Sequence, residues 1–419
     1  MGRSGVAWGV VSRAATCANS LVAAISFSSV ALASAAPSAS TQSGLSIDRS
    51  RLYFCDQDDG TWVRGASYKA RFGANGMRYI PDFGFDAPCN FPMDVTLREA
   101  TLGDEALPLS AVASVSRHGD QFLLDRGPVD IVVEVGVDQI EQTFVLDAAG
   151  ESRDLRLVLD VKTDLLGAME NGELRWSGAL GSVHYSEAFV LDGAGRRETI
   201  STEFDGTAIT LTVPGSFLAL AEGEIVIDPV IRTFTVSNIQ GSQHNVDVTY
   251  DLTTNQFLYI FEDQFSATDM DILATSLDAD SGVPVAAEYF EVGGGDYSDP
   301  SVATKNADDV SLCVATWNDP LFGTAYVVQG RVWDHHQGTF GPTFIASILS
   351  NSGFSDVGGS SSETPGGAFC VAWTRGGTST GEVFYKMYMG TGTVMSVGSL
   401  SQPGTWPGGT VSISESSGT

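Results

Sequence analysis

Basic residues are scarce in this chain. It has 22 lysines and arginines against 51 aspartates and glutamates, a formal net charge of −29 over 419 residues. Nucleic acids and anionic lipid surfaces are bound by clustered Lys and Arg side chains. The deficit therefore argues against a nucleic-acid-binding protein and against one that binds anionic membranes. So acidic a surface suits salty or cation-rich surroundings, where screening weakens self-repulsion.

Histidine is also rare, with five in the chain, and no C-x-x-C motif occurs. Both facts argue against a zinc ribbon or a thioredoxin-like redox centre. The adjacent pair His335 and His336 lies at a predicted turn tip, so we expect both side chains to face solvent. Gly377–Gly381 matches G-x-S-x-G, but a strand-like segment follows it, where a nucleophile elbow needs a helix. We assign no catalytic residue from these motifs.

Long apolar runs are limited to the N-terminus. Ala14–Ala36 is mostly apolar, follows two arginines and ends in the A-x-A pattern Ala33–Ala35. This predicts a secretory signal peptide over residues 1–35, cleaved after about Ala35, and hence a secreted or extracytoplasmic protein. The alternative is an uncleaved membrane anchor. A flexible linker is expected over residues 36–50.

Four cysteines lie beyond the leader. Cys55 and Cys89 share one short stretch, and export permits disulfides, so we predict a bond between them. Two buried thiols are the alternative. The state of Cys313 and Cys370 is left open.

Residues 51–231 have the pattern of successive strands. Asp130–Val137, Leu155–Val161 and Thr207–Val213 alternate apolar and polar residues, and Gly-containing turns separate such segments. The spacing predicts an antiparallel β-sandwich-like domain. A single short helix is expected at Ser216–Gly223, with Ser216 as its N-cap.

Residues 232–419 carry an internal repeat. Phe257–Phe261, Cys313–Trp317 and Phe369–Trp373 are mostly apolar and are spaced by 56 residues. The aligned aromatic column is Phe261, Trp317 and Trp373. Runs that are apolar on both faces suit sheets covered on both sides, as in a β-propeller blade. The overall prediction is an all-β chain in which propeller-like repeats of about 56 residues follow the sandwich.

The repeat is incomplete. Three copies are expected near 245–300, 301–355 and 356–410, followed by the start of a fourth. Propellers usually have four to eight blades. We therefore expect either that further copies follow in a longer chain or that blades of another subunit complete the set.

The sequence resembles a group of exported bacterial proteins that have not been characterised. The similar segments are Phe265–Ile272, Val248–Asp251 and the Ile-Asp-Pro-Val motif at Ile227–Val230. In that group a β-rich module ending in Ile-Asp-Pro-Val precedes propeller-like repeats. The resemblance covers roughly residues 50–390 and implies the fold and an exported location. It implies no activity and no catalytic residue.

Two acidic turns are weak candidates for calcium, which prefers clusters of carboxylate oxygens. Their candidate ligands are Asp56, Asp58, Asp59, Asp278 and Asp280. Neither turn has the full ligand set of an EF-hand, so ordinary turn chemistry is the alternative. No other cofactor is expected.

Four further carboxylates, Glu262, Asp263, Asp269 and Asp271, gather near the edge of one predicted blade. Glycoside hydrolysis needs two carboxylates at a defined separation. Asp319 repeats Asp263 at the 56-residue spacing, as a structural turn acid would. We therefore expect a non-enzymatic binding, adhesion or envelope-associated protein, whose ligand is a glycan, an envelope component or another protein. The alternatives are a glycan-acting hydrolase using acidic propeller loops and a passive structural component of the envelope.

Overall fold

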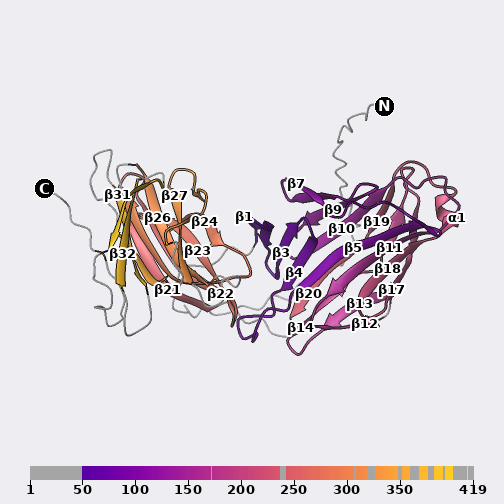
Figure 1. The fold of residues 1–419 in the computed structure, drawn as a ribbon, viewed down its shortest axis with the longest axis horizontal. Helices are drawn as coiled ribbons and strands as arrows, with labels where there is room; N and C mark the ends of the chain where they lie inside the picture. Colours follow the sequence, from indigo (N-terminus) through magenta and orange to yellow (C-terminus); the bar gives the residue numbers. More distant parts are fainter. Residues whose placement is uncertain are drawn as a thin grey trace, which may run out of the picture. The chain divides into compact units, whose positions relative to one another are not determined.

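A computed structural model describes residues 50–399, apart from 171, 236–241, 306–307, 319–325, 348–351, 359–367, 376–381 and 390–391, together with Ile413. The predicted signal peptide, nearly all of the linker and the G-x-S-x-G segment lie outside these residues. From Leu45 onward the chain forms one compact unit. This unit is all-β with antiparallel sheets, which confirms the predicted fold class (Figure 1). Among the described residues, no helix has the length and hydropathy that crossing a bilayer requires.

Two sheets form the first module. Within the described ranges the first sheet holds nine strands, β1 (Tyr53–Gln57), β2 (Gly60–Arg64), β3 (Tyr68–Gly73), β4 (Gly76–Pro81), β5 (Met93–Leu102), β6 (Glu105–Ala106), β11 (Leu155–Lys162), β17 (Ser201–Phe204) and β18 (Ala208–Val213). The second sheet, counted over the same ranges, holds eleven, β7 (Ser114–His118), β8 (Gln121–Asp125), β9 (Val129–Val135), β10 (Gln139–Leu146), β12 (Leu166–Glu170), β13 (Glu173–Ser177), β14 (Gly181–Tyr185), β15 (Phe189–Leu191), β16 (Arg197–Thr199), β19 (Ile225–Asp228) and β20 (Val230–Thr235).

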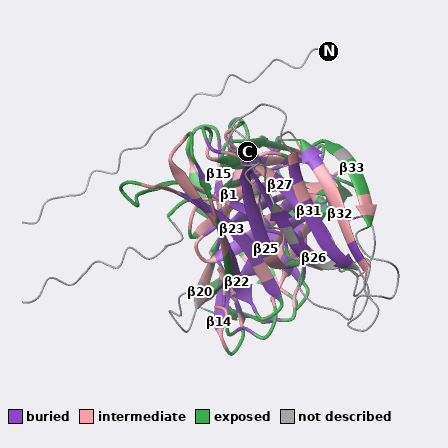
Figure 2. Cartoon of the chain, turned by 90° about the vertical axis from the view of Figure 1, so that its left-hand side faces the viewer, coloured by how far each residue is buried: buried purple, intermediate pink, exposed green. Residues whose placement is uncertain are grey.

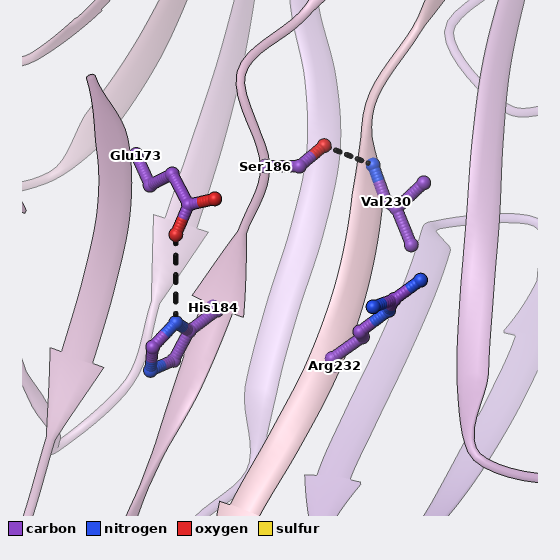
Figure 3. A pocket seen from close by; sticks show the side chains of 5 residues that line it. All are labelled: Glu173, His184, Ser186, Val230 and Arg232. Atoms are coloured by element: carbon purple, nitrogen blue, oxygen red, sulfur yellow. Dashed lines mark hydrogen bonds and ion pairs between the residues drawn. The ribbon is translucent and has the colours of Figure 1, made fainter. Parts of the chain in front are cut away.

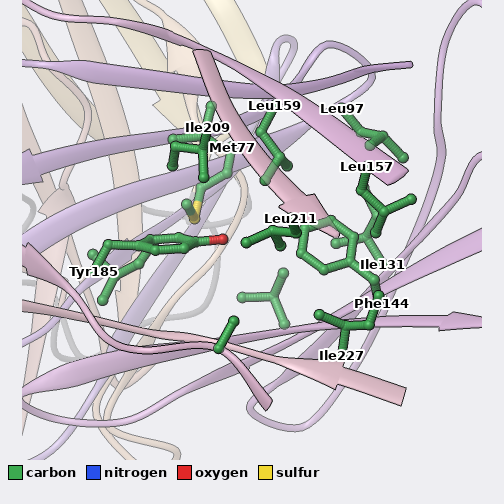
Figure 4. Close-up of a cluster of buried hydrophobic side chains, with 14 of the residues drawn as sticks. Met77, Leu97, Ile131, Phe144, Leu157, Leu159, Tyr185, Ile209, Leu211 and Ile227 are labelled. Atoms are coloured by element: carbon green, nitrogen blue, oxygen red, sulfur yellow. The ribbon is translucent and has the colours of Figure 1, made fainter. Parts of the chain in front are cut away.

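The core of this module lies between the two sheets. Every second residue of β10 is buried, as the alternating sequence of a half-buried strand requires. Leu157 and Leu211 of the first sheet meet Ile131 and Phe144 of the second in one cluster of buried side chains (Figure 4). Each such side chain contributes roughly 1.5–3 kcal/mol when it is fully buried. The module is therefore a sandwich with its own apolar core.

Pro229 lies in the middle of a sheet rather than at its edge. β19 and β20 follow one another along β10, so the Ile-Asp-Pro-Val segment is central. On the other side, the neighbouring strand changes from β15 to β14 at this point. Ser186 fills the break, since its Oγ accepts the Val230 amide at 2.9 Å. Pro229 has no backbone N–H, and it lies at the change of partner strand, where no ladder hydrogen bond requires that donor.

The predicted helix is shorter than expected and begins one residue earlier. α1 spans Gly215–Leu218, with Pro214 as its N-cap. Ser216 lies inside the helix. Asp154 from outside the helix accepts the Gly215 amide at 2.7 Å, so this carboxylate serves the helix N-terminus in its place.

Three antiparallel sheets follow the sandwich. In the described residues their strands are β21 (Ser242–Asp251), β22 (Gln256–Ser266), β23 (Asp269–Asp278) and β24 (Pro284–Glu291) in the first repeat sheet; β25 (Asp296–Lys305), β26 (Val310–Asn318), β27 (Tyr326–Asp334), β28 (Thr339–Phe340) and β29 (Phe344–Ile345) in the second; and β30 (Ser352–Gly358), β31 (Ala368–Arg375), β32 (Glu382–Met389) and β33 (Val394–Ser399) in the third. β20 ends at Thr235, so the last strand of the sandwich runs past the predicted boundary at residue 231.

The repeat sheets pack face to face in series. β25 packs against β21, β22 and β23, and β30 packs against β25, β26 and β27. One buried cluster joins the first and second repeat sheets, and another joins the second and third. Figure 2 shows β25 and β26 largely buried and the edge strand β33 exposed. In the second and third repeat sheets the first strand therefore makes most of the contact with the sheet before it.

Backbone geometry repeats between the first two of these sheets. Asn245 and Asp299 adopt a left-handed conformation at a bulge in β21 and β25, and Asn255 and Asp309 do so in the turn that follows. Asn and Asp tolerate this conformation better than other residues with a side chain. Both pairs are 54 residues apart, because 299 − 245 and 309 − 255 are each 54.

This spacing corrects the predicted aromatic column. The strand register aligns Phe261 with Ala315, two residues before Trp317. Phe261, Trp317 and Trp373 all lie on the second strand of their sheets, on the face toward the preceding module. Equivalent second-strand residues Tyr259, Cys313 and Val371 are 54 and then 58 residues apart, because 313 − 259 is 54 and 371 − 313 is 58, and the connection after the first strand is longer in the third sheet. The two spacings average 56, so the sequence alignment places Trp317 two residues out. The three residues thus share a face, but Trp317 is at a different level.

Candidate functional site

The four acidic residues singled out by the sequence lie on β22 and β23, but all are buried. Glu262 is 3% exposed, Asp269 is 1% exposed, and Asp263 and Asp271 are fully buried. Asp263 and Asp271 face each other directly across the two strands. Like charges at such a position destabilise a sheet unless other groups compensate them.

Lys69 of β3 supplies this compensation from the sandwich. Its Nζ donates to Asp269 Oδ1 at 2.7 Å and to Asp271 Oδ1 at 2.8 Å. It also donates to the Gly293 carbonyl at 3.2 Å, and the lysine is fully buried. Asn90 donates a further hydrogen bond to Asp269, at 2.6 Å. A charged hydrogen-bond network thus joins the sandwich to the first repeat sheet.

A second cation lies beside the first. Arg64 of β2 pairs with Asp82 at 3.3 Å. The Phe265 ring lies 4.4 Å from the Arg64 guanidinium carbon and 4.4 Å from Lys69 Nζ. Aromatic faces attract cations electrostatically, and more strongly where water is excluded. Phe265 therefore helps to hold both positive groups at the joint.

Burial shifts two pKa values in the same region. Burial raises the pKa of the Asp271 carboxyl well above its ordinary value, with Asp269 adding to the effect and Lys69 opposing it. Burial also raises the pKa of Tyr289, and Asp263 adds to this. The Tyr289 hydroxyl donates to Asp263 at 2.7 Å. It therefore stays protonated and serves as a donor.

Glu262 connects neighbouring sheets. Its Oε1 accepts Asn245 Nδ2 at 2.8 Å and the Asp299 amide at 2.9 Å. Both donors belong to the left-handed residues of the bulges in β21 and β25. Its role in the fold is to hold two bulges together. Asp319, the predicted repeat of Asp263, lies outside the described residues.

This carboxylate cluster cannot work as a glycosidase pair in the described conformation. A glycosidase needs one carboxyl at the glycosidic oxygen and another at the anomeric carbon, so both must contact the substrate. Here Asp269 and Asp271 contact Lys69, and Asp263 contacts Tyr289. The arrangement instead links two modules through charge-assisted hydrogen bonds.

The calcium candidates are engaged in turns. Asp56 accepts the Thr61 hydroxyl at 2.6 Å, and Asp59 pairs with Arg71. No group of three or more His, Cys, Asp or Glu side chains in the described part of the chain is placed to hold a metal ion.

The second acidic turn uses its carboxylates in the same way. Asp278 accepts the amide and hydroxyl of Ser281 at 2.8 and 2.7 Å, and these bonds lower the pKa of its carboxyl. Asp280 accepts Asn255 Nδ2 at 3.0 Å. Both carboxylates of this turn thus accept hydrogen bonds from the protein. In the first acidic turn, the side chain of Asp58 is exposed.

The predicted disulfide between Cys55 and Cys89 is not formed, and both thiols are free. Cys55 is buried on the face of β1 that packs on the first repeat sheet, whereas Cys89 is exposed in the connection after β4. Burial, with Glu291 adding to it, raises the pKa of the Cys55 thiol far above its usual range. Burial also raises the thiol pKa of Cys313 and of Cys370. The buried thiols of Cys55 and Cys313 are therefore unreactive.

The two adjacent histidines differ, so the expectation that both face solvent is wrong for one. His336 is exposed and pairs with Asp309 at 2.9 Å. His335 is 1% exposed, and its Nε2 lies 2.7 Å from the hydroxyl of Ser311, itself fully buried. Burial lowers the pKa of His335. A buried Ser–His contact without access for a substrate is a packing feature and not a nucleophile.

One shallow depression opens on the outer face of the sandwich. It has a volume of about 180 Å³ and is lined by Glu173, His184, Ser186, Val230 and Arg232 (Figure 3). His184 Nδ1 lies 3.7 Å from Glu173. Arg232 forms no ion pair with another described residue. A guanidinium beside an imidazole could contact a carboxylate or phosphate here.

Sequence reasoning missed Lys69, Arg64 and the burial of His335. In β3, Lys69 alternates with the core residues Tyr68 and Ala70, which is the pattern of a solvent-facing side chain. The opposite face of β3 is covered by the first repeat sheet, so the polar half of the alternation is buried as well. Long-range packing decides this, and only a lone lysine among apolar neighbours hints at it.

The fold and these contacts define a class of architecture: a β-sandwich joined by a buried ionic network to propeller-like sheets. No known family model matches the chain, and no curated protein resembles it significantly in sequence.

Proposed function

We propose that the chain is an exported, non-enzymatic binding or adhesion protein that uses the surface of its propeller-like repeats. Its ligand is a glycan, an envelope component or another protein. The observation that carries the proposal is the burial of Asp263, Asp269 and Asp271, the carboxylates best placed for catalysis. Each is held by a side chain of the protein, so none is available to a substrate. This supports binding over hydrolysis.

The joint between modules suits such a role. Lys69 and the apolar contacts of Tyr53 and Trp62 with Phe261 and Leu273 fix the first repeat sheet on the sandwich. A rigid platform loses less conformational entropy when it binds than a mobile one does.

Export is proposed from the N-terminal leader. The mature protein is expected to begin after about Ala35, which N-terminal sequencing of the protein from its native host would show. A retained leader in a membrane fraction would favour the anchor instead.

The binding proposal is tested with the purified mature chain on a glycan array and on envelope fractions, with release of reducing ends followed in the same samples. We expect retention on at least one glycan or envelope fraction without release of sugar. Steady release of reducing ends by wild type would overturn the non-enzymatic assignment. Retention on neither surface would overturn the binding role and favour the passive structural one.

A further inference from the structure

Three side chains at the joint between the sandwich and the first repeat sheet are placed for a covalent reaction. Lys69 Nζ lies 2.7 Å from Asp269 Oδ1 and 2.8 Å from Asp271 Oδ1. None of the three side chains has exposed surface. A lysine amine is a nucleophile towards carbonyl carbon, and an amine and a carboxyl group condense to an amide and water. The contact between Lys69 and Asp269 therefore brings the two reactants of an amide bond together.

The pocket supplies what this condensation lacks in water. Groups held in reactive geometry behave as though each were present at an effective concentration of about 10⁵–10⁸ M. Lys69 Nζ is already within hydrogen-bond distance of an oxygen on the Asp269 carboxyl carbon, and both side chains come from strands. The Phe265 ring covers Nζ at 4.4 Å. Because water is excluded, it neither competes with the amine nor hydrolyses the amide.

The surrounding groups fit the product as well as the ions. A buried ion pair carries a large desolvation cost, and condensation removes the charges of Lys69 and Asp269 together. The amide that replaces them needs one acceptor and one donor. The Gly293 carbonyl, 3.2 Å from Nζ, is in place to accept its N–H. Asn90 already donates to Asp269 Oδ2 at 2.6 Å, so the amide oxygen also has its partner.

Asp271 is placed to move the proton. Nζ must lose a proton before it attacks, and Asp271 is the second carboxylate in contact with it. Burial raises the pKa of Asp271, so its carboxylate takes up a proton more readily than an ordinary aspartate does. Its Oδ2 is buried and has no hydrogen-bond partner within the part of the chain that the structure describes. That oxygen is therefore available to carry the proton.

We propose that Lys69 and Asp269 form a side-chain amide bond in the folded protein, with Asp271 as the proton relay. Nζ attacks the carboxyl carbon of Asp269, the C–N bond forms, and the bond from that carbon to Oδ1 breaks. The two protons that Nζ loses pass through Asp271 to Oδ1, which leaves as water. Asp271 ends in its starting state, and no oxidant or reductant is needed.

This bond would tie the sandwich covalently to the first repeat sheet. The described conformation holds Lys69 and Asp269 as an ion pair, which is the state before the reaction. The two residues are 200 positions apart, so the amide closes a long loop. Replacing Lys69 removes the ion pair and the amide alike. The proposal is independent of the ligand of the protein.

Intact-mass spectrometry of the reduced and denatured mature chain tests the proposal. We expect wild type to be lighter, by one water molecule, than the mass calculated from its measured N-terminus. Proteolysis and tandem mass spectrometry should then recover a branched peptide that joins Lys69 to Asp269. The full calculated mass in wild type would overturn the proposal whatever the variants show. A branch at Asp271 would overturn the roles given to the two aspartates.

Lys69→Arg shows whether the water is lost at this pair. Arginine keeps the positive charge but has no nucleophilic amine, so this variant should have its full calculated mass. Loss of water in Lys69→Arg would place the dehydration elsewhere and overturn the proposal. Arg98→Gln is the folded control, because Arg98 and its partner Asp160 are half exposed, and it should lose water as wild type does. Lys305 is an internal control, since its partner Asp308 is 37% exposed and open to water, and it should stay unbranched.

Asp271→Asn tests the relay. Asparagine keeps the size of the side chain but does not take up the proton, and proton transfer by a positioned side chain contributes about 10²–10⁴-fold. The amide should therefore form at least about a hundredfold more slowly, measured by intact mass at intervals after cell-free synthesis. Circular dichroism checks that the variant is folded. Formation at the wild-type rate would overturn the role given to Asp271.

Discussion

A lysine without solvent contact is stable only because its partners are charged. Moving an ion out of water costs several kcal/mol even after the protein relaxes, and ion partners offset that cost only in good geometry. Lys69 has two carboxylates and a carbonyl within hydrogen-bond distance, so its three protons are all used. The two carboxylates depend on it in turn, since no other cation contacts Asp271 directly among the hydrogen bonds of the described residues.

Replacing Lys69 by methionine should therefore be strongly destabilising. The change keeps the aliphatic stem but leaves Asp269 and Asp271 buried without their cation, and breaking such a network costs about 3–5 kcal/mol. Urea unfolding followed by circular dichroism measures the loss. Arg98→Gln is the control, because Arg98 pairs with Asp160 where both are half exposed, and exposed pairs contribute about 0–1 kcal/mol. A Lys69→Met variant within 1 kcal/mol of that control would contradict the role given to this network.

His335 makes stability depend on pH in a defined direction. Its pKa in the folded protein lies below the ordinary 6.5, because burial opposes the charged ring more than Asp251, Asp309 and Asp334 favour it. As the pH falls below about 6.5, the unfolded chain therefore binds more protons at this histidine than the folded protein does. The free energy of unfolding is highest above about pH 6.5 and decreases below it.

The comparison of wild type with His335→Gln isolates this effect. Glutamine can still bond to Ser311 but does not titrate. Between about pH 7.5 and pH 5.5, wild type should lose more free energy of unfolding in urea than the variant does. The opposite pH effect of Asp271 is present in both proteins and cancels. Equal losses would show that His335 is free to take up a proton in the folded state.

At the scale of elements, the sequence predicted what local patterns determine. β9, β11 and β18 lie within two residues of the alternating segments at 130–137, 155–161 and 207–213. The change of partner strand beside Pro229 could not be predicted from the local pattern, because it depends on residues about forty positions away. The carboxylates were found as a group, but Lys69 lies about 200 residues before them, so the pattern could not reveal that they are buried.

The hydrogen bonds between first strands are a repeated element and can be tested. Asp247 accepts the Ser301 hydroxyl at 3.0 Å and the Val302 amide at 2.9 Å. Asp247→Ala leaves the Val302 amide in a buried strand without this acceptor, which should cost about 1–3 kcal/mol. Hydrogen exchange of the β25 amides should speed up in the alanine variant and recover in Asp247→Asn, which keeps one acceptor oxygen. Asp280→Ala, in an exposed turn, is the control and should change neither the free energy of unfolding nor the exchange of the β25 amides. Exchange of β25 in Asp247→Ala that is as slow as in wild type would contradict the role given to Asp247.

At the scale of the whole molecule, the charged network and the apolar cluster around Phe261 make two modules depend on one another. The sandwich has an extensive core of its own, whereas the first repeat sheet buries one face partly against the sandwich and the other against its neighbour. Sheets stacked in this way owe their stability to interfaces between neighbours. Loss of the joint should therefore harm the repeat sheets more than the sandwich.

We accordingly expect wild type to unfold in one urea transition and Lys69→Met to unfold in two. Hydrogen exchange at increasing urea concentration separates the modules, with β11 reporting on the sandwich and β26 on the repeats. In the variant β26 should open at lower urea than β11, while the two strands open together in wild type and in Arg98→Gln. Separate opening in wild type would mean that the sandwich and the sheets fold independently. A single transition in Lys69→Met would mean that the apolar contacts of Tyr53, Trp62 and Phe261 suffice to couple them without the buried charges.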